Sequence, residues 1–187
     1  MAPTPSHTEV PQSTIDHFKS IPWCSPSISD PSFRLVSMSR TLTQPGNGHS
    51  LMAATWNTDE TIKELLSMYR PADKSTGQTG EVRRFYTFGT GLNSHANVLH
   101  GGVIGSILDS SMGNAIGQGI PDRTPTFTVQ LNISYKNPVK TPGTIMARSW
   151  VVKAEGRKIW VQGVIESGNG IVHATSEGIW LRAKPNM

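Results

Sequence analysis

The segment 101–117 limits the folds open to this chain more than any other. Its apolar residues fall within one broad arc at about 100° per residue, the spacing of an amphipathic helix. They are Val103, Ile104, Ile107, Leu108, Met112, Ala115 and Ile116. A helix this apolar must be covered by other elements, so we expect it to lie buried at the centre of the domain.

Runs that favour β-strands lie on both sides of this helix. Residues 82–88 are rich in Phe, Tyr, Thr and Val, and residues 127–136 alternate strictly between apolar and polar side chains. Three further runs, 144–154, 157–166 and 171–182, are separated by short turns typical of hairpins. This order of elements predicts an α+β fold, in which a curved antiparallel sheet wraps around one long central helix.

We expect two parts in the chain, an N-terminal extension over residues 1–80 and a compact domain over residues 81–187. The first 50 or so residues are rich in Pro, Ser and Thr, with short apolar islands, so one or two short helices should lie against the domain. A helix is also predicted from Asn57, which can cap it, to Pro71, which would end it. Its apolar residues follow helical spacing: Ile62, Leu65, Leu66 and Tyr69.

Charge and cysteine content narrow the possible partners. The chain has 17 Lys and Arg against 13 Asp and Glu, a net charge of +4 without long basic runs. This argues against a nucleic-acid-binding arm, while a small basic excess suits a small anionic ligand. Cys24 is the single cysteine, which excludes an internal disulfide framework.

The first 12 residues lack the pattern of a targeting signal, and no apolar run is long enough to span a membrane. We therefore expect a cytoplasmic protein with no membrane partner.

The chemistry should lie at the start of the central helix. His100 is followed by Gly101 and Gly102, where the first N–H groups of a helix have no partner and the helix dipole is positive. Two glycines allow a ligand to approach the backbone closely. The arrangement suits an oxygen that becomes negative, such as a thioester carbonyl under attack. The alternative is that His100 only caps the helix and the glycines only serve packing.

Asp109 is the single acid in this helix, and no Lys or Arg lies between Arg84 and Arg123 to pair with it. Small residues, Gly105 and Gly113, flank it on its face of the helix. Asp109 follows Gly101 by eight residues, which is about 12 Å along a helix, too far for both to act on one carbonyl. If both groups serve one reaction, two subunits must share each site, which predicts a homodimer or a dimer of dimers.

The motif of His100, Gly101 and Gly102, followed after six residues by Asp109, resembles the HGG(x6)D signature of hotdog-fold acyl-CoA thioesterases of the phenylacetate type. The segment FTVQLNISYKNPV, residues 127–139, is similar to the strand after the helix in mammalian members of the thioesterase superfamily. The resemblance covers about residues 82–182. It implies a hydrolase that releases a free carboxylic acid and a thiol from acyl-CoA or acyl-carrier-protein thioesters, without cofactor or metal.

The same resemblance implies roles for individual residues. Asp109 would act as general base or as nucleophile, and the Gly101 N–H would polarise the thioester carbonyl. His100 would order the loop or contact the thioester, and Thr128 would help to place the water. The remaining substrate-binding candidates are Gly102, Asn93, Asn97, Ser110, Lys136 and Lys158, the lysines being suited to the phosphates of CoA. One position departs from some relatives, since Ser94 stands where they carry Asn or Gln.

Other functions fit less well. Gly89, Thr90 and Gly91 suggest a dinucleotide-binding turn, but no third glycine follows and the later strands predict hairpins. Ser106 lacks the G-x-S-x-G context of a serine hydrolase, and the histidines lack metal-site spacing. A hotdog dehydratase would carry HFPG and a later Glu, which are absent here. Two alternatives stay open: a polyketide-releasing thioesterase that acts on a carrier protein, and a non-catalytic acyl-binding module.

Overall fold

The computed structural model describes residues 10–122 and 124–184. The start of the predicted extension, residues 1–9, where we expected no targeting signal, lies outside the described residues, as does the end of the predicted domain, residues 185–187. In the described part of the chain, no helix is long and apolar enough to cross a membrane.

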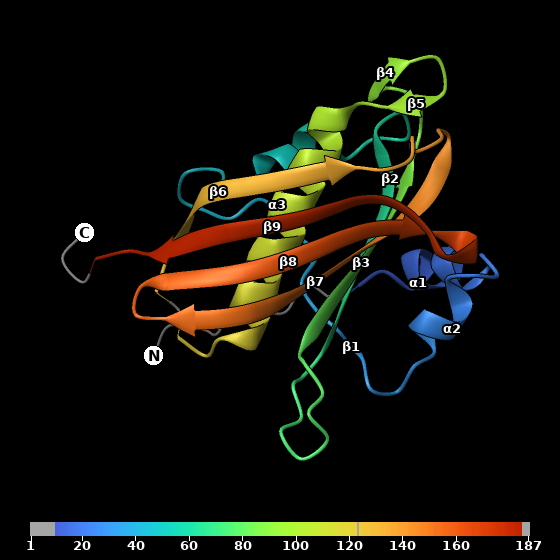
Figure 1. Ribbon diagram of the computed structural model, residues 1–187. Helices are drawn as coiled ribbons and strands as arrows, with labels where there is room; N and C mark the ends of the chain where they lie inside the picture. The colour runs from blue at the N-terminus through green and yellow to red at the C-terminus, as the bar shows by residue number, and fades with distance from the viewer. Residues whose placement is uncertain (1–9, 123, 185–187) are drawn as a thin grey trace.

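The described residues form one antiparallel sheet of seven strands, which curves around a long helix, α3 (Gly101–Gly119) (Figure 1). The fold predicted from the sequence is therefore confirmed. The strands in spatial order are β1 (Arg34–Leu35), β2 (Ile62–Arg70), β3 (Glu81–Phe88), β7 (Gly143–Glu155), β8 (Lys158–Ser167), β9 (Ile171–Arg182) and β6 (Thr126–Tyr135). A separate small hairpin, β4 (Asn93–His95) with β5 (Val98–Leu99), leads directly into α3.

The core lies between α3 and the concave face of the sheet. Ile107, Leu108 and Met112 of α3 are completely buried. Gly163 of β8 lies directly beneath the helix, and a Cβ there would lie only 3.0 Å from Met112 Sδ and 3.1 Å from Leu108 Cδ2. A glycine at this position therefore lets the helix approach the sheet closely and fixes its height above the strands.

The helix predicted from Asn57 is wrong, because this segment contains β2 instead. Leu65 and Tyr69 belong to the core under α3, whereas Leu66 and Met68 belong to a second apolar cluster. A strand buried on both faces carries a continuous apolar run, which imitates helical spacing. Since β1 and β2 pair with the rest of the sheet, the sheet extends across the boundary predicted at residues 80 and 81.

The N-terminal segment covers the outer face of β2, β3 and β7. Two short helices, α1 (Gln12–Lys19) and α2 (Ser25–Ile28), pack there, as Figure 1 shows in blue. The apolar residues in this second cluster are Phe18, Cys24, Ile28, Phe33, Leu66, Met68, Phe85 and Met146. A short π-helix, η1 (Leu51–Thr55), follows later in the segment. Arg40 holds η1 by donating to the carbonyl oxygens of Met52 and Trp56, both at 3.1 Å.

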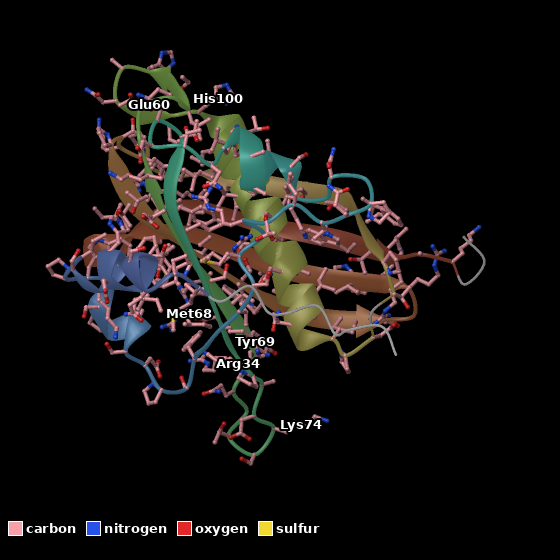
Figure 2. The ribbon with its side chains drawn as sticks, turned by 180° about the vertical axis from the view of Figure 1, so that it is seen from behind. Arg34, Glu60, Met68, Tyr69, Lys74 and His100 are labelled. Atoms are coloured by element: carbon pink, nitrogen blue, oxygen red, sulfur yellow. The ribbon has the colours of Figure 1, made fainter. Side chains whose placement is uncertain are left out.

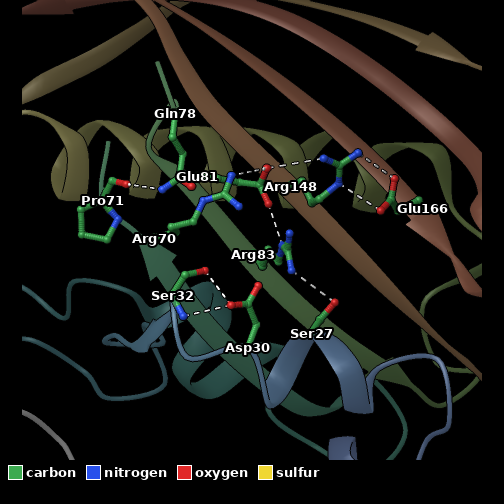
Figure 3. Close-up of polar contacts among 10 residues, drawn as sticks. All are labelled: Ser27, Asp30, Ser32, Arg70, Pro71, Gln78, Glu81, Arg83, Arg148 and Glu166. Atoms are coloured by element: carbon green, nitrogen blue, oxygen red, sulfur yellow. Dashed lines mark hydrogen bonds and ion pairs between the residues drawn. The ribbon is translucent and has the colours of Figure 1, made fainter. Parts of the chain in front are cut away.

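An arginine-rich cluster fastens this segment to the sheet (Figure 3). The Glu81 carboxylate lies 2.6 Å from Arg83, 3.5 Å from Arg148 and 3.7 Å from Arg70. The guanidinium groups of Arg83 and Arg70 lie 4.0 and 5.0 Å from the centre of the Phe33 ring. Glu81 therefore offsets a local excess of positive charge, and two of its arginines hold the N-terminal segment by cation–π contacts.

Candidate active site

The N-terminus of α3 presents one free backbone amide. His100 is the N-cap, and its Nδ1 accepts a 2.8 Å hydrogen bond from the Gly102 N–H. Neutral His100 then carries its proton on Nε2. Among the hydrogen bonds of the described residues, none is donated by the Gly101 N–H. Of the two glycine amides predicted to meet the substrate, that of Gly102 is thus occupied within the helix cap, and that of Gly101 is available to a ligand.

The hairpin before α3 uses both candidate asparagines for its own structure. Asn93 Oδ1 accepts a hydrogen bond of 2.5 Å from the Thr141 hydroxyl. Asn97 has a positive φ of 58°, and its carbonyl oxygen accepts from the Thr141 N–H at 3.1 Å. These contacts place the hairpin and so set the position of His100, which Figure 2 shows at the same end of the molecule as Glu60.

Strand β6 lies across α3 and contacts it at two functional positions. The Tyr135 hydroxyl donates to the Gly101 carbonyl oxygen at 2.9 Å, and Thr128 Oγ1 donates to Asp109 Oδ1 at 2.7 Å. The structure therefore brings together Asp109 and Thr128, which the sequence placed 19 residues apart. Gly101 and Asp109 remain about 12 Å apart along their helix, as the rise per residue requires.

Asp109 lines a cavity of about 510 Å³. Its walls come from α3, from β6 and from the segment around η1: Gly102, Gly105, Ser106, Asp109, Ser110, Leu131, His49, Leu51 and Met52. The last three escaped the sequence analysis, because nothing in a Pro- and Ser-rich extension signals that it will fold back against the helix. Of the two small residues that flank Asp109, Gly105 is covered by Ile133, whose Cδ1 would lie 3.3 Å from an added Cβ, whereas Gly113 faces open space.

Two other hollows, of about 550 and 350 Å³, lie on the face of the sheet turned away from α3. Trp160, Gln162 and Glu177 contribute to the larger one. The cavity at Asp109 is the better candidate for the active site although it is smaller than the first of these, because it contains a carboxylate that a hydroxyl holds in place.

Ser110 is linked to a residue that the sequence analysis missed. Its Oγ accepts a 2.7 Å hydrogen bond from Nη1 of Arg84, and Arg84 is completely buried. The burial of Arg84 could have been predicted from the alternation of side chains between the two faces of β3. Val82, Tyr86 and Phe88 face the core, so the residue between them, Arg84, had to face it as well.

The two candidate lysines do not meet in one subunit. The Lys136 N–H pairs with the His173 carbonyl oxygen at one end of β9, and Lys158 pairs with Leu181 near the other end. Eight residues of strand separate these positions by about 26 Å.

Within residues 10–122 and 124–184, no group of three His, Cys, Asp or Glu side chains lies close enough together to bind a metal ion.

Comparisons with known proteins find similarity to thioesterases. The family model described as thioesterase superfamily matches residues 96–173. Acyl-coenzyme A thioesterase THEM4 of Rattus norvegicus is 30% identical over 125 residues, which are 66% of this chain and 50% of the relative. The chain spans between 33% and 50% of the length of the first curated relatives that it matches.

Solved structures show the same fold. Zebra fish thioesterase superfamily member 2 superposes with a TM-score of 0.60 at 16% identity, over 78% of this chain and 93% of that one. The BH2602 protein from Bacillus halodurans, solved with CoA, gives 0.51 at 25% identity, over 62% and 73%. With a central helix wrapped by an antiparallel sheet, the chain has the hotdog fold of these thioesterase structures, and residues 96–173 are similar to the thioesterase superfamily.

Proposed function

We propose that this protein is a thioester hydrolase that converts acyl-CoA and water into a free carboxylic acid and CoA. The observation that carries the proposal is the Asp109 carboxylate, held by Thr128 at 2.7 Å and facing a cavity of about 510 Å³. The rat relative is named an acyl-coenzyme A thioesterase, and the Bacillus halodurans structure contains CoA, which supports CoA as the thiol.

The chemistry follows from the positions of the acid and the amide. Asp109 accepts a proton from water while the water oxygen bonds to the thioester carbonyl carbon. The carbonyl oxygen becomes negative and is stabilised by the Gly101 N–H at the positive end of α3. The C–S bond then breaks, and the thiolate leaves and takes up the proton that Asp109 accepted. In the second form of this reaction, the Asp109 carboxylate attacks the carbonyl carbon, the C–S bond breaks and the thiolate leaves, and water then cleaves the resulting anhydride.

This reaction needs two subunits, because Asp109 and Gly101 of one helix lie about 12 Å apart. We therefore include in the proposal a homodimer in which Asp109 of one subunit faces Gly101 of the other; a dimer of dimers would preserve the same sites. The edge position of β6 supports a dimer, since its side chains Phe127, Val129 and Tyr135 are 56%, 55% and 55% exposed. Apolar side chains on an open strand edge favour pairing with another chain.

We keep the cytoplasm as the proposed compartment, because Cys24 is free and buried, as suits a reducing environment. We keep Lys136 and Lys158 as proposed contacts for the phosphates of CoA. Their separation means that they would serve different sites or different subunits.

The test is release of free thiol from a panel of acyl-CoA and acyl-pantetheine thioesters by the wild type and by Asp109→Asn. We expect Asp109→Asn to keep the fold and to lower kcat by about 100-fold or more, the contribution of a general base. Asp59→Asn, which changes an exposed acid outside the cavity, is the matched control and should retain full activity. Undiminished turnover in folded Asp109→Asn would rule out the mechanism, and hydrolysis of pantetheine thioesters alone would point to a carrier-protein substrate.

A further inference from the structure

A buried positive charge lies directly behind the proposed active site. Arg84 has no exposed surface, and within residues 10–122 and 124–184 no carboxylate lies within ion-pair distance of its guanidinium. Its three nitrogens donate instead to neutral oxygens: Ser67 Oγ at 2.8 Å, Ser110 Oγ at 2.7 Å and the Met38 carbonyl oxygen at 2.9 Å. Burial of a cation without an anion is unfavourable, so a role for its charge has to be sought in its partners.

Of these partners, Ser110 also lines the cavity, one residue after Asp109. Because Ser110 Oγ accepts from Arg84, its own proton is directed elsewhere, and no acceptor for that proton is found in the described part of the chain. Ser106, one turn earlier in the same cavity, differs in this respect. Its hydroxyl donates to the Gly102 carbonyl oxygen at 3.0 Å and is therefore satisfied within the helix.

A hydroxyl that accepts from a guanidinium is polarised and becomes a stronger donor. Two more buried polar atoms in this region lack partners among the described residues: the hydroxyl of Tyr86, whose ring centre lies 5.5 Å from the Arg84 guanidinium, and Oδ1 of Asn114, one helical turn beyond Ser110. Neither atom lines the cavity, so within this polar layer the Ser110 hydroxyl is the group that meets a ligand. A purely hydrocarbon acyl chain would leave this donor unpaired.

We infer that Ser110, positioned by Arg84, binds an oxygen carried by the acyl chain, and that the preferred substrates are 3-hydroxy- or 3-oxoacyl thioesters. The position of the oxygen follows from the adjacency of the two residues, which both line the cavity. An oxygen on the third carbon lies roughly 3–4 Å from the thioester carbonyl carbon. When the carbonyl lies at Asp109, such an oxygen stays beside Asp109, where Ser110 is the neighbouring donor with an unused proton. The inference rests on the proposed thioester hydrolysis.

The test compares kcat/KM for 3-hydroxydecanoyl and decanoyl thioesters of CoA and of pantetheine. For the wild type we expect a preference of about tenfold or more for the hydroxylated chain, as a site built to hydrogen-bond a substrate oxygen gives. Ser110→Ala should bring the ratio close to one, and the matched variant Ser106→Ala should leave the ratio unchanged. Arg84→Lys should lower the ratio, because a lysine cannot reproduce the three hydrogen bonds that the guanidinium donates to Ser67, Ser110 and Met38. If Arg84→Lys slows both substrates equally, Arg84 has only a structural role.

The outcomes separate the two proposals. Hydrolysis of both thioesters at equal rates would overturn the inference and leave the hydrolase in place. If neither thioester is hydrolysed, the proposed function fails, and binding of 3-hydroxydecanoate and decanoate, measured by calorimetry, then decides whether the oxygen subsite exists. Tighter binding of 3-hydroxydecanoate that Ser110→Ala abolishes supports the subsite, and equal binding contradicts it.

Discussion

The hydroxyl of Thr128 donates a 2.7 Å hydrogen bond to Oδ1 of Asp109, and so joins the edge strand β6 to the middle of α3. The bond uses one carboxylate oxygen. Within the described residues, no hydrogen bond to Oδ2 is found, which leaves that oxygen to meet a water or a thioester. Thr128 thus fixes the direction in which the acid acts.

We predict that Thr128→Val, which keeps the shape of the side chain and removes its donor, lowers kcat for acyl-CoA hydrolysis by about 10- to 100-fold. A hydrogen bond to a charged group is worth about 1.5–3 kcal/mol, and each 1.4 kcal/mol corresponds to a factor of about ten in rate. Thr128→Ser retains the hydroxyl and should recover most of the activity. Equal activity in Thr128→Val and the wild type, measured by thiol release, would show that the bond does not orient the acid.

The sequence allowed the prediction of the central helix and of β3, β6, β7, β8 and β9, because their periodicities reflect burial on one face. It misled for β2. Burial of Leu66 and Met68 under the N-terminal helices is a tertiary contact, and it removes the polar alternation of a strand. The role of His49 as a cavity wall likewise depends on how the extension folds back, for which local sequence holds no signal.

Asp109 and Thr128 could be related through family resemblance, and the structure shows their contact directly. The resemblance also assigned carbonyl polarisation to the Gly101 N–H, but the occupation of the Gly102 N–H by the His100 ring is a detail that it did not supply. This occupation depends on the extended backbone of His100, with φ −64° and ψ 134°, which turns its ring back onto the Gly102 N–H.

The arginine cluster around Glu81 predicts a large effect of a small substitution. Glu81→Gln would leave Arg70, Arg83 and Arg148 close together without the carboxylate that they share. We expect a loss of about 2 kcal/mol in the free energy of unfolding, less than for a fully buried pair because these side chains are partly exposed. Urea denaturation is the measurement. Glu155→Gln, which breaks the exposed pair with Lys153, should cost under about 1 kcal/mol, and equal losses would contradict the prediction.

Cys24 reports on the attachment of the N-terminal segment. Burial raises the pKa of its thiol from 9.0 to about 12, so almost no reactive thiolate exists at pH 8. We expect thiol reagents to leave the native protein unmodified and to react fully after denaturation. Glu81→Gln should accelerate labelling under native conditions by loosening the segment that covers Cys24. Rapid labelling of the native wild type at pH 8 would show that the segment detaches readily on its own.

The sharing of each site between subunits can be tested by complementation of two inactive variants. Asp109→Asn lacks the acid, and Gly101→Pro lacks the free amide. Proline suits this position, since Gly101 is the first residue of α3 and His100 before it is extended. Gly101→Ala is the control for the amide: its Cβ would lie 3.5 Å from the Tyr135 ring, an ordinary contact, and the N–H is retained. We expect this control to stay active.

When the two inactive variants are unfolded separately and refolded together, random pairing makes half of the dimers mixed. One of the two sites in a mixed dimer then combines an intact Asp109 with an intact Gly101, so about a quarter of the wild-type activity should return. Each variant refolded alone should remain inactive, and mass spectrometry of the intact dimers measures the mixed fraction. If mixed dimers form and no activity returns, Asp109 acts within its own subunit. The amide that stabilises the carbonyl oxygen must then be sought near Asp109, and Gly101 would serve only the packing of Tyr135 against the start of α3.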